Sequence, residues 1–412
     1  MADHYDRLET QSDYVRSAFQ FEKLRELLGA IAGRAPGLDN VVIPSVTDRA
    51  ALAQLPILRK SALTDLQAAN PPFGGLTTKP PSEFDHIFMS PGPIFEPGSM
   101  APDWWRFARA FHALGVRKGD VLQNCFAYHL TPAGMMMESG ARALGCTVVP
   151  GGIGATEQQA QAMSITRATG YAGTPDYLKV ILEKGDELGL DLRSVSMALV
   201  SGGALFPSLR QDYADRGILC LQCYATADLG LIAYETQRDG EPLEGMIVDE
   251  GVILEIVRPG TGDPVADGEV GEVVVTSLNP DYPLIRFATG DLSAVLPGES
   301  ACGRTGLRIK GWMGRADQRT KIKGMFVDTP QVDAVVKRHP EIAKARVVVA
   351  REGEQDVFVV KVESDVADPE FTSQVSETVA SVFKVRGQVE AVASGALPND
   401  GKVIEDTREY GA

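Results

Sequence analysis

The sequence lacks any long apolar run and any excess of positive charge. No apolar stretch approaches the roughly 20 residues that a membrane-spanning helix needs. Residues 1–14 contain neither the basic segment nor the apolar segment of a secretory signal. The formal net charge is −15, so we do not expect the basic stripe of a nucleic-acid-binding protein. We therefore expect a protein that binds neither membranes nor nucleic acids.

Cysteine is also scarce, with five residues in the chain. Such a sparse, odd set fits a reducing cytoplasm better than a disulfide framework. Cys220 and Cys223 have a C-x-x-C spacing, but they fall in the apolar run 218–224. On a strand their side chains would point to opposite faces, so we interpret them as core residues. A metal site would need a second pair of ligands, and Cys302 stands alone.

The length and the hydrophobic pattern predict at least two domains. A chain of 412 residues is too long for one compact core. Residues 12–31 have helical periodicity. Strands and helices then alternate, which predicts helices covering a mainly parallel sheet. The expected elements are strand 121–126, helix 132–144, buried strand 147–150, helix 156–169, helix 176–184 and strand 198–201.

The pattern changes twice further along the chain. Two Val-rich strands at 252–257 and 272–277 predict an antiparallel β subdomain. From Gly314 a compact β-α-β-β-α-β unit is expected. Its elements are strand 321–327, helix 330–338, strands 345–351 and 357–363, helix 368–384 and strand 388–392. The fold class is therefore α/β, with a large domain 1–313 and a small α+β domain 314–412.

Three segments place ligand-binding residue types at the ends of strands, where α/β proteins bind ligands. Ser201–Gly202–Gly203 either admits a flat ring close to the backbone or only makes a tight turn. Residues 224–230 offer an aromatic ring, a hydroxyl and the carboxylate of Asp228, a suitable ligand for Mg²⁺. Asp291 follows a glycine at the end of an apolar strand, so it could accept bonds from ribose hydroxyls or simply serve as a turn residue.

Two further segments lie at the expected domain boundary and near the C-terminus. Asp317, in Gly314–Arg315–Ala316–Asp317, could act as a pivot between domains. Lys402 follows Pro398 and Gly401, and in isolation it would be interpreted as a surface lysine.

The order of these segments is more specific than any one of them. Tyr-Ala-Thr-Ala-Asp at 224–228, Arg-x-x-x-Gly-Asp at 286–291, Gly-Arg-x-Asp at 314–317 and Leu-Pro-x-x-Gly-Lys at 397–402 follow one another. This order resembles the adenylate-forming (AMP-binding) superfamily, and more narrowly its phenylacetate–CoA ligase branch. The resemblance extends over essentially the whole chain.

The resemblance implies an AMP-forming acid–CoA ligase that acts on an aromatic or other small organic acid. ATP, Mg²⁺ and coenzyme A would be its cofactors, and relatives are often homodimers. The implied nucleotide-binding residues are Ser90, Gly92, Gly202, Gly203, Ala204, Tyr224, Ala225, Thr226, Asp291 and Arg315. Lys402 would bridge the carboxylate and the α-phosphate as the catalytic residue, Asp317 would be the hinge, and Gly324 would lie on the loop for the thiol step. Asp228 would hold Mg²⁺, and by position Tyr128, His129 and Thr131 would line the acyl pocket.

Two departures from the family pattern fall on the phosphate side. The family's phosphate loop is rich in Ser, Thr and Gly and carries a lysine. Here residues 90–97 keep Ser90 and Gly92, but Glu96 brings a negative charge and extra prolines remove N–H donors. Ala227 replaces a hydroxyl residue, for which Thr226 could substitute. The alternatives are an adenylating enzyme with an acceptor other than CoA, or a catalytically impaired relative that binds a nucleotide or acyl-CoA.

Overall fold

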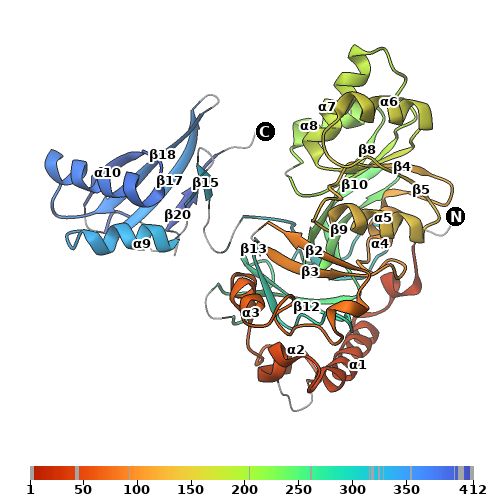
Figure 1. The fold of residues 1–412 in the computed structure, drawn as a ribbon, viewed down its shortest axis with the longest axis horizontal. Coiled ribbons are helices and arrows are strands. Elements are labelled where there is room, and N and C mark those ends of the chain that lie inside the picture. The colour runs from red at the N-terminus through yellow and green to blue at the C-terminus, as the bar shows by residue number, and fades with distance from the viewer. Residues whose placement is uncertain are drawn as a thin grey trace. The chain divides into compact units, whose positions relative to one another are not determined.

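The computed structural model divides the chain into two compact units, Met1–Gly314 and Arg315–Ala412 (Figure 1). It describes residues 4–41, 46–91, 93–203, 205–259, 262–314, 316, 320–322, 325–327, 329–352, 355–393, 395–397 and 403–408. The observed boundary lies one residue beyond the one expected from the sequence.

After the short helical segment η1 (Arg7–Thr10), the first unit contains the long helix α1 (Asp13–Ile31), as the periodicity predicted. The Ser12 hydroxyl caps it by accepting a bond from the Val15 N–H at 3.4 Å. Its buried face includes Leu24, Leu27 and Ile31, at the spacing of one helix face. Shorter helical segments follow, namely η2 (Pro36–Val41), α2 (Arg49–Leu52), η3 (Lys60–Ala62), α3 (Leu63–Ala69) and η4 (Pro81–Glu83).

An eight-stranded mixed sheet crosses the first unit in the order β14-β10-β9-β8-β7-β6-β4-β5. The strands from β8 to β5 are parallel, whereas β8, β9, β10 and β14 pair antiparallel. The parallel strands are β4 (Val121–Asn124), β5 (Thr147–Pro150), β6 (Gly170–Gly173), β7 (Met197–Val200) and β8 (Leu219–Thr226). The others are β9 (Gly230–Arg238), β10 (Glu241–Val248) and β14 (Arg308–Ile309).

Helices cover both faces of the parallel part of this sheet (Figure 1). On one face α4 (Ala108–Leu114) and α5 (Ala133–Ala143) pack over Leu199, Leu221 and Cys223. On the other, α6 (Thr156–Thr166), α7 (Pro175–Glu187) and α8 (Pro207–Asp215) pack over Ala198 and Cys220. Cys220 and Cys223 are both buried, which confirms that they are core residues on opposite faces.

Two details of the predicted sheet are wrong. Strand 147–150 was expected to be buried, but β5 is an edge strand that pairs with β4 alone, and Thr147 and Pro150 are exposed. β6 was not predicted at all, although all four of its residues are buried between β4 and β7. Two of those four residues are glycines, which are depleted in strands, so propensity concealed the strand.

A four-stranded sheet with the order β1-β13-β12-β11 forms the β subdomain. Its strands are β1 (Leu58–Arg59), β11 (Val252–Val257), β12 (Gly271–Ser277) and β13 (Phe287–Ser293). The antiparallel pairing of β11 with β12 confirms the prediction, and β1 adds a short parallel edge beside β13. A separate hairpin joins β2 (His86–Ser90) to β3 (Ile94–Gly98).

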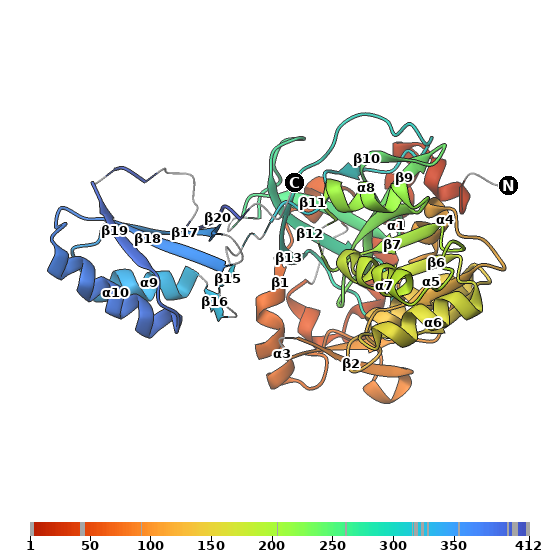
Figure 2. The same ribbon diagram turned by 90° about the horizontal axis from the view of Figure 1, so that it is seen from above.

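The second unit is a four-stranded sheet of order β19-β18-β17-β20 with both helices on one side (Figure 2). Its strands are β17 (Lys344–Glu352), β18 (Gln355–Glu363), β19 (Gln388–Val392) and β20 (Ile404–Asp406), and its helices are α9 (Thr329–Arg338) and α10 (Pro369–Phe383). Val347, Val360 and Phe383 belong to the core that the sheet shares with the helices. The predicted strand 321–327 is instead a tight antiparallel pair, β15 (Thr320–Ile322) and β16 (Met325–Val327). The predicted α/β fold class is confirmed.

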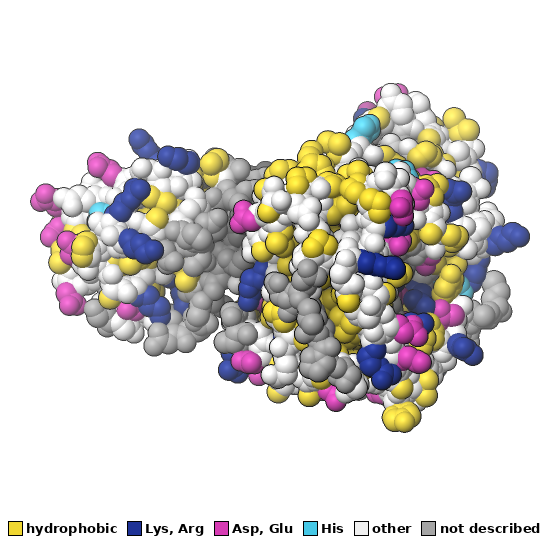
Figure 3. All heavy atoms as spheres, turned by 60° about the horizontal axis from the view of Figure 1, so that its bottom comes forward, with side chains coloured by type: hydrophobic (Ala, Val, Ile, Leu, Met, Phe, Trp, Pro, Cys, Tyr) yellow, Lys and Arg dark blue, Asp and Glu magenta, His cyan; other side chains and the backbone are white. Residues whose placement is uncertain are grey.

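No helix in the described ranges is long and apolar enough to cross a membrane. On the face shown in Figure 3, Lys and Arg side chains are interspersed with Asp and Glu.

Arg286, which belongs to one of the sequence motifs, is a structural residue of the β subdomain. It is 2% exposed and forms a bidentate ion pair with Glu255, with N–O distances of 3.0 and 3.1 Å. Its guanidinium also donates to the carbonyl oxygens of Ala53 and Leu55. Arg286 thereby ties the segment before β1 to the sheet that carries Asp291.

Replacing Arg286 with Met should destabilise the first unit by about 3–5 kcal/mol, because Glu255 would be left buried without its partner. Urea unfolding followed by tryptophan fluorescence measures this, since all three tryptophans lie in that unit. The control is Arg193→Met, which removes the exposed pair with Asp191 and should leave the free energy of unfolding nearly unchanged. Equal losses in the two variants would contradict a structural role for Arg286.

Candidate active site

The predicted binding segments gather where the parallel strands end. Tyr128 and Thr131 follow β4, and Gly202 and Gly203 follow β7. Tyr224 lies near the end of β8. Because parallel strands place their carboxyl ends at one edge of a sheet, these segments face the same side. The sheet thus assembles residues that are far apart in the sequence.

Asp291 is the centre of a hydrogen-bonded cluster. It lies on β13 and is 8% exposed. The Tyr224 hydroxyl donates to Asp291 Oδ2 at 2.8 Å, and the Trp312 indole N–H donates to Oδ1 at 3.0 Å. The predicted adenine residue and the predicted ribose residue are therefore in direct contact. Trp312 was not predicted, although its place two residues before Gly314 was a usable signal.

The segment after β7 needs its glycine. Gly202 has a φ of +73°, and a Cβ there would reach only Phe126 and Thr174, each at 3.9 Å. The Ser201 hydroxyl donates to the Cys223 carbonyl at 2.8 Å, which holds this turn against the end of β8. The result is a bare backbone surface beside Tyr224 that suits a flat ring.

Residues 227–229 form the turn between β8 and β9. Ala225 and Thr226 close β8 and pair with β9. The Thr226 hydroxyl accepts a bond from the Leu229 N–H at 3.2 Å, so in this structure it stabilises the turn. The Asp228 side chain is fully buried, and its Oδ2 lies 2.6 Å from the Lys60 ammonium. Asp228 Oδ1 has no hydrogen-bond partner among the described residues.

Glu96 faces Ser90 across the β2–β3 hairpin. The Ser90 hydroxyl donates to Glu96 Oε1, and the Ser90 N–H donates to Oε2 at 3.3 Å. Burial and the nearby Asp228 raise the pKa of Glu96 to about 7, while Ser90 and Lys60 partly offset that rise. Glu96 thus holds the serine that was predicted to contact phosphate.

The predicted acyl-pocket residues lie on the loop between β4 and α5. The Tyr128 hydroxyl accepts from Asn124 at 2.7 Å and donates to Glu138 at 3.0 Å. Burial and Glu138 raise the pKa of Tyr128. Thr131 is half-buried and His129 is exposed, so Tyr128 is the best anchored of the three.

Six predicted site residues lie outside the described part of the chain. They are Gly92, Ala204, Arg315, Asp317, Gly324 and Lys402. Their roles stay predictions, as do those of the described site residues.

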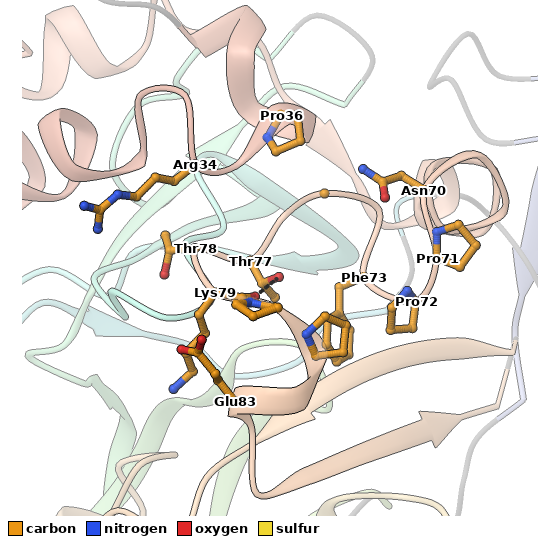
Figure 4. A pocket seen from close by; sticks show the side chains of 13 residues that line it. Arg34, Pro36, Asn70, Pro71, Pro72, Phe73, Thr77, Thr78, Lys79 and Glu83 are labelled. Atoms are coloured by element: carbon orange, nitrogen blue, oxygen red, sulfur yellow. Dashed lines mark hydrogen bonds between the residues drawn. The ribbon is translucent and has the colours of Figure 1, made fainter.

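A separate hollow of about 480 Å³ lies in the N-terminal part of the first unit (Figure 4). Lys79 lines it, pairs with Asp281 at 3.1 Å and lies over the Phe84 ring. The lining residues are Arg34, Pro36, Asn70, Pro71, Pro72, Phe73, Gly75, Thr77, Thr78, Lys79, Pro80, Pro81 and Glu83. None of the predicted site residues is among them.

Comparison with known proteins identifies the family. Residues 125–279 match the family model described as AMP-binding enzyme. The chain is 30% identical over 395 residues to a phenylacetate–coenzyme A ligase of Thermus thermophilus, covering 91% of this chain and 86% of that protein. The chain belongs to the phenylacetate–coenzyme A ligase family. A second member, from Pseudomonas putida, is 30% identical over 76% of this chain and 72% of its own length.

A solved structure agrees with this family assignment. A crystal structure of 2-hydroxyisobutyryl-CoA ligase in complex with 2-HIB-AMP and CoA has a TM-score of 0.73 and 25% sequence identity, covering 99% of this chain and 93% of that one. The predictions of an adenylate-forming fold and of an AMP-forming acid–CoA ligase are thus confirmed.

The raised pKa of Glu96 predicts a pH-dependent stability. Unfolded Glu96 would ionise near its ordinary value of 4.5, whereas the folded state keeps the proton to about pH 7. Stability therefore falls as the pH rises from about 4.5 to 7, by about 3 kcal/mol at most. Glu96→Gln should remove this loss. In urea unfolding, the free energy of unfolding of the variant relative to the wild type should therefore be higher at pH 8 than at pH 5.

The exposed Glu22 supplies the control for this measurement. Glu22→Gln should change the free energy of unfolding by less than about 0.5 kcal/mol at every pH. A Glu96→Gln advantage that is the same at pH 5 and pH 8 would rule out the protonated, buried carboxyl.

Proposed function

We propose that this member of the ligase family activates an aromatic carboxylic acid with ATP and then transfers the acyl group to coenzyme A. The observation that carries the proposal is the bond from Tyr224 to Asp291, which joins the end of the parallel sheet to the β subdomain. The names of the curated relatives support phenylacetate or a similar aryl acid as the substrate.

Each step has a defined bond change. A carboxylate oxygen of the acid attacks the α-phosphorus of ATP, and pyrophosphate leaves with the bridging oxygen. The sulfur of coenzyme A then attacks the acyl carbon, the thiol proton is released to water, and AMP leaves with the adenylate oxygen. Lys402 would stabilise the charge that develops at the α-phosphate, where a preorganised cation is most effective. Asp317 would be the hinge about which the small domain rotates between the two steps. Gly324 would lie on the loop that takes part in the thiol step.

Asp291 would accept bonds from the ribose hydroxyls. Tyr224 and Trp312 already donate to its two oxygens, so the carboxylate is held in one orientation before the nucleotide binds. Gly202 and Gly203 would frame the adenine ring together with Tyr224, and Arg315 would lie near the ribose or phosphate. A carboxylate that is already oriented needs no reorganisation when it binds the nucleotide.

Asp228 fits the role of a magnesium ligand, since its buried Oδ1 lacks a partner among the described residues. In that part of the chain no group of three or more His, Cys, Asp or Glu side chains could hold a metal ion. Mg²⁺ would thus need phosphate oxygens as further ligands, which suits an ion that arrives with ATP. The metal would neutralise charge on the phosphates.

A second function is favoured by one observation. The Ser90 hydroxyl, which would be needed to bind the phosphates, already donates a hydrogen bond to Glu96. A protein that binds AMP or acyl-AMP without using ATP would be compatible with that contact.

A cytoplasmic location is proposed from the five free cysteines, and a homodimer is proposed by family resemblance.

A pyrophosphate-release assay distinguishes these functions. Purified protein with ATP, Mg²⁺, CoA and a panel of aryl and small aliphatic acids should release pyrophosphate and AMP, most rapidly with an aryl acid. Binding of AMP without release of either product for any acid would favour the second function.

Lys402→Ala separates the two half-reactions. Adenylation should fall about 10²–10³-fold, as when one transition-state donor is lost. Thioester formation from supplied acyl-AMP and CoA should stay within about threefold, because the proposed rotation about Asp317 would carry Lys402 away from the α-phosphate before that step. Equal losses in both half-reactions would contradict the role assigned to Lys402.

A further inference from the structure

Lys60 stands beside the strand that carries Asp291. It begins η3 directly after β1, and the β1 residues Leu58 and Arg59 pair in parallel with Phe287 and Ala288 of β13. The Leu58 N–H also donates to the Arg286 carbonyl at 3.1 Å. Lys60 is therefore held by the backbone next to the β13 residues that precede Asp291.

The Lys60 side chain extends from there to the opposite side of the site. Its ammonium lies 2.6 Å from Asp228 Oδ2, 168 residues away in the sequence. Its charge also favours ionised Glu96, which is bonded to Ser90. The ammonium thus joins the segment beside β13 to the turn that follows β8, and its charge acts on Glu96 of the β2–β3 hairpin.

Exposure distinguishes Lys60 from its carboxylate neighbours. The Asp228 side chain is 0% exposed and Glu96 is 1% exposed, whereas the Lys60 side chain is 29% exposed. Lys60 is therefore the most accessible member of this group. The buried Asp228 carboxylate holds it in place, and a charged partner of this kind fixes the position of a long flexible side chain.

The sequence of the phosphate loop makes a cation from elsewhere necessary. Residues 90–97 contain no Lys or Arg, and Glu96 adds a negative charge. A triphosphate brought next to Glu96 and Asp228 would be repelled without a compensating positive charge. We propose that Lys60 supplies the phosphate-binding cation that residues 90–97 lack, and that it contacts the pyrophosphate as it leaves.

The step that Lys60 assists is the first one of the proposed function, on which this inference rests. As the bond from the α-phosphorus to the bridging oxygen breaks, negative charge grows on the pyrophosphate. Mg²⁺ bound at Asp228 would weaken the hold of that carboxylate on Lys60, and the ammonium would turn to the phosphate oxygens. No proton is transferred in the step.

The test compares Lys60→Gln with Lys79→Gln. Gln at residue 60 can still donate to Asp228 but carries no charge. Lys79 is a matched control, since it also pairs with an aspartate and is 24% exposed, but it lines the hollow of Figure 4. ATP–pyrophosphate exchange should fall about 10²–10³-fold in Lys60→Gln. It should stay within about twofold in Lys79→Gln.

Two further measurements separate a phosphate contact from a structural role. Calorimetric titration with AMP and with a non-hydrolysable ATP analogue measures the two affinities. Lys60→Gln should bind the analogue at least tenfold more weakly than the wild type and should bind AMP with unchanged affinity. Lys60→Arg, which keeps the charge, should recover most of the exchange activity. Equal weakening of both nucleotides, or exchange activity within threefold of the wild type, would overturn the proposal.

The wild-type protein separates this proposal from the broader one. If the wild type shows no exchange with any acid, the proposed ATP-dependent function fails. If the wild type exchanges and Lys60→Gln does so equally well, only the role of Lys60 fails. Should Lys60→Gln not fold, the same comparison is made with Lys60→Arg, which should keep its preference for the ATP analogue over AMP. Loss of that preference would overturn the proposal.

Discussion

The hydrogen bond between Tyr224 and Asp291 is the contact on which the site depends. A buried carboxylate is costly unless it is hydrogen-bonded, and Tyr224 and Trp312 satisfy both Asp291 oxygens. Tyr224 comes from the parallel sheet, Asp291 from the β subdomain and Trp312 from the segment before Gly314. One satisfied carboxylate therefore brings three parts of the chain together at the candidate site.

The buried carboxylates Asp228 and Glu96 also need hydrogen-bond partners, but Asp228 is only partly satisfied by the residues that the structure describes. Asp228 and Glu96 are both buried. Lys60 pairs with one oxygen of Asp228, and Ser90 donates to both oxygens of Glu96. Asp228 keeps an oxygen without a partner in the described ranges. An unpartnered buried carboxylate oxygen is uncommon, and at Asp228 it agrees with the magnesium role proposed above.

Arg286 shows how similar chemistry can serve stability instead. Its bidentate pair with Glu255 resembles a binding contact, but further bonds to Ala53 and Leu55 satisfy the guanidinium within the protein. The Arg-x-x-x-Gly-Asp motif therefore combines one residue that holds the β subdomain together with one carboxylate that faces the candidate site. A motif read as a single functional unit would have assigned both residues to the ligand.

Hydrophobic periodicity and motif order were enough to predict the α/β class, most helices, the core cysteines and the family, because they reflect local geometry. It missed β6, whose glycines hide a buried strand, and it misjudged β5, since edge position depends on which strands pair. Only the tertiary structure joined Lys60 to Asp228 and Trp312 to Asp291. Contacts between distant residues follow from how sheets pack, and no local pattern encodes that.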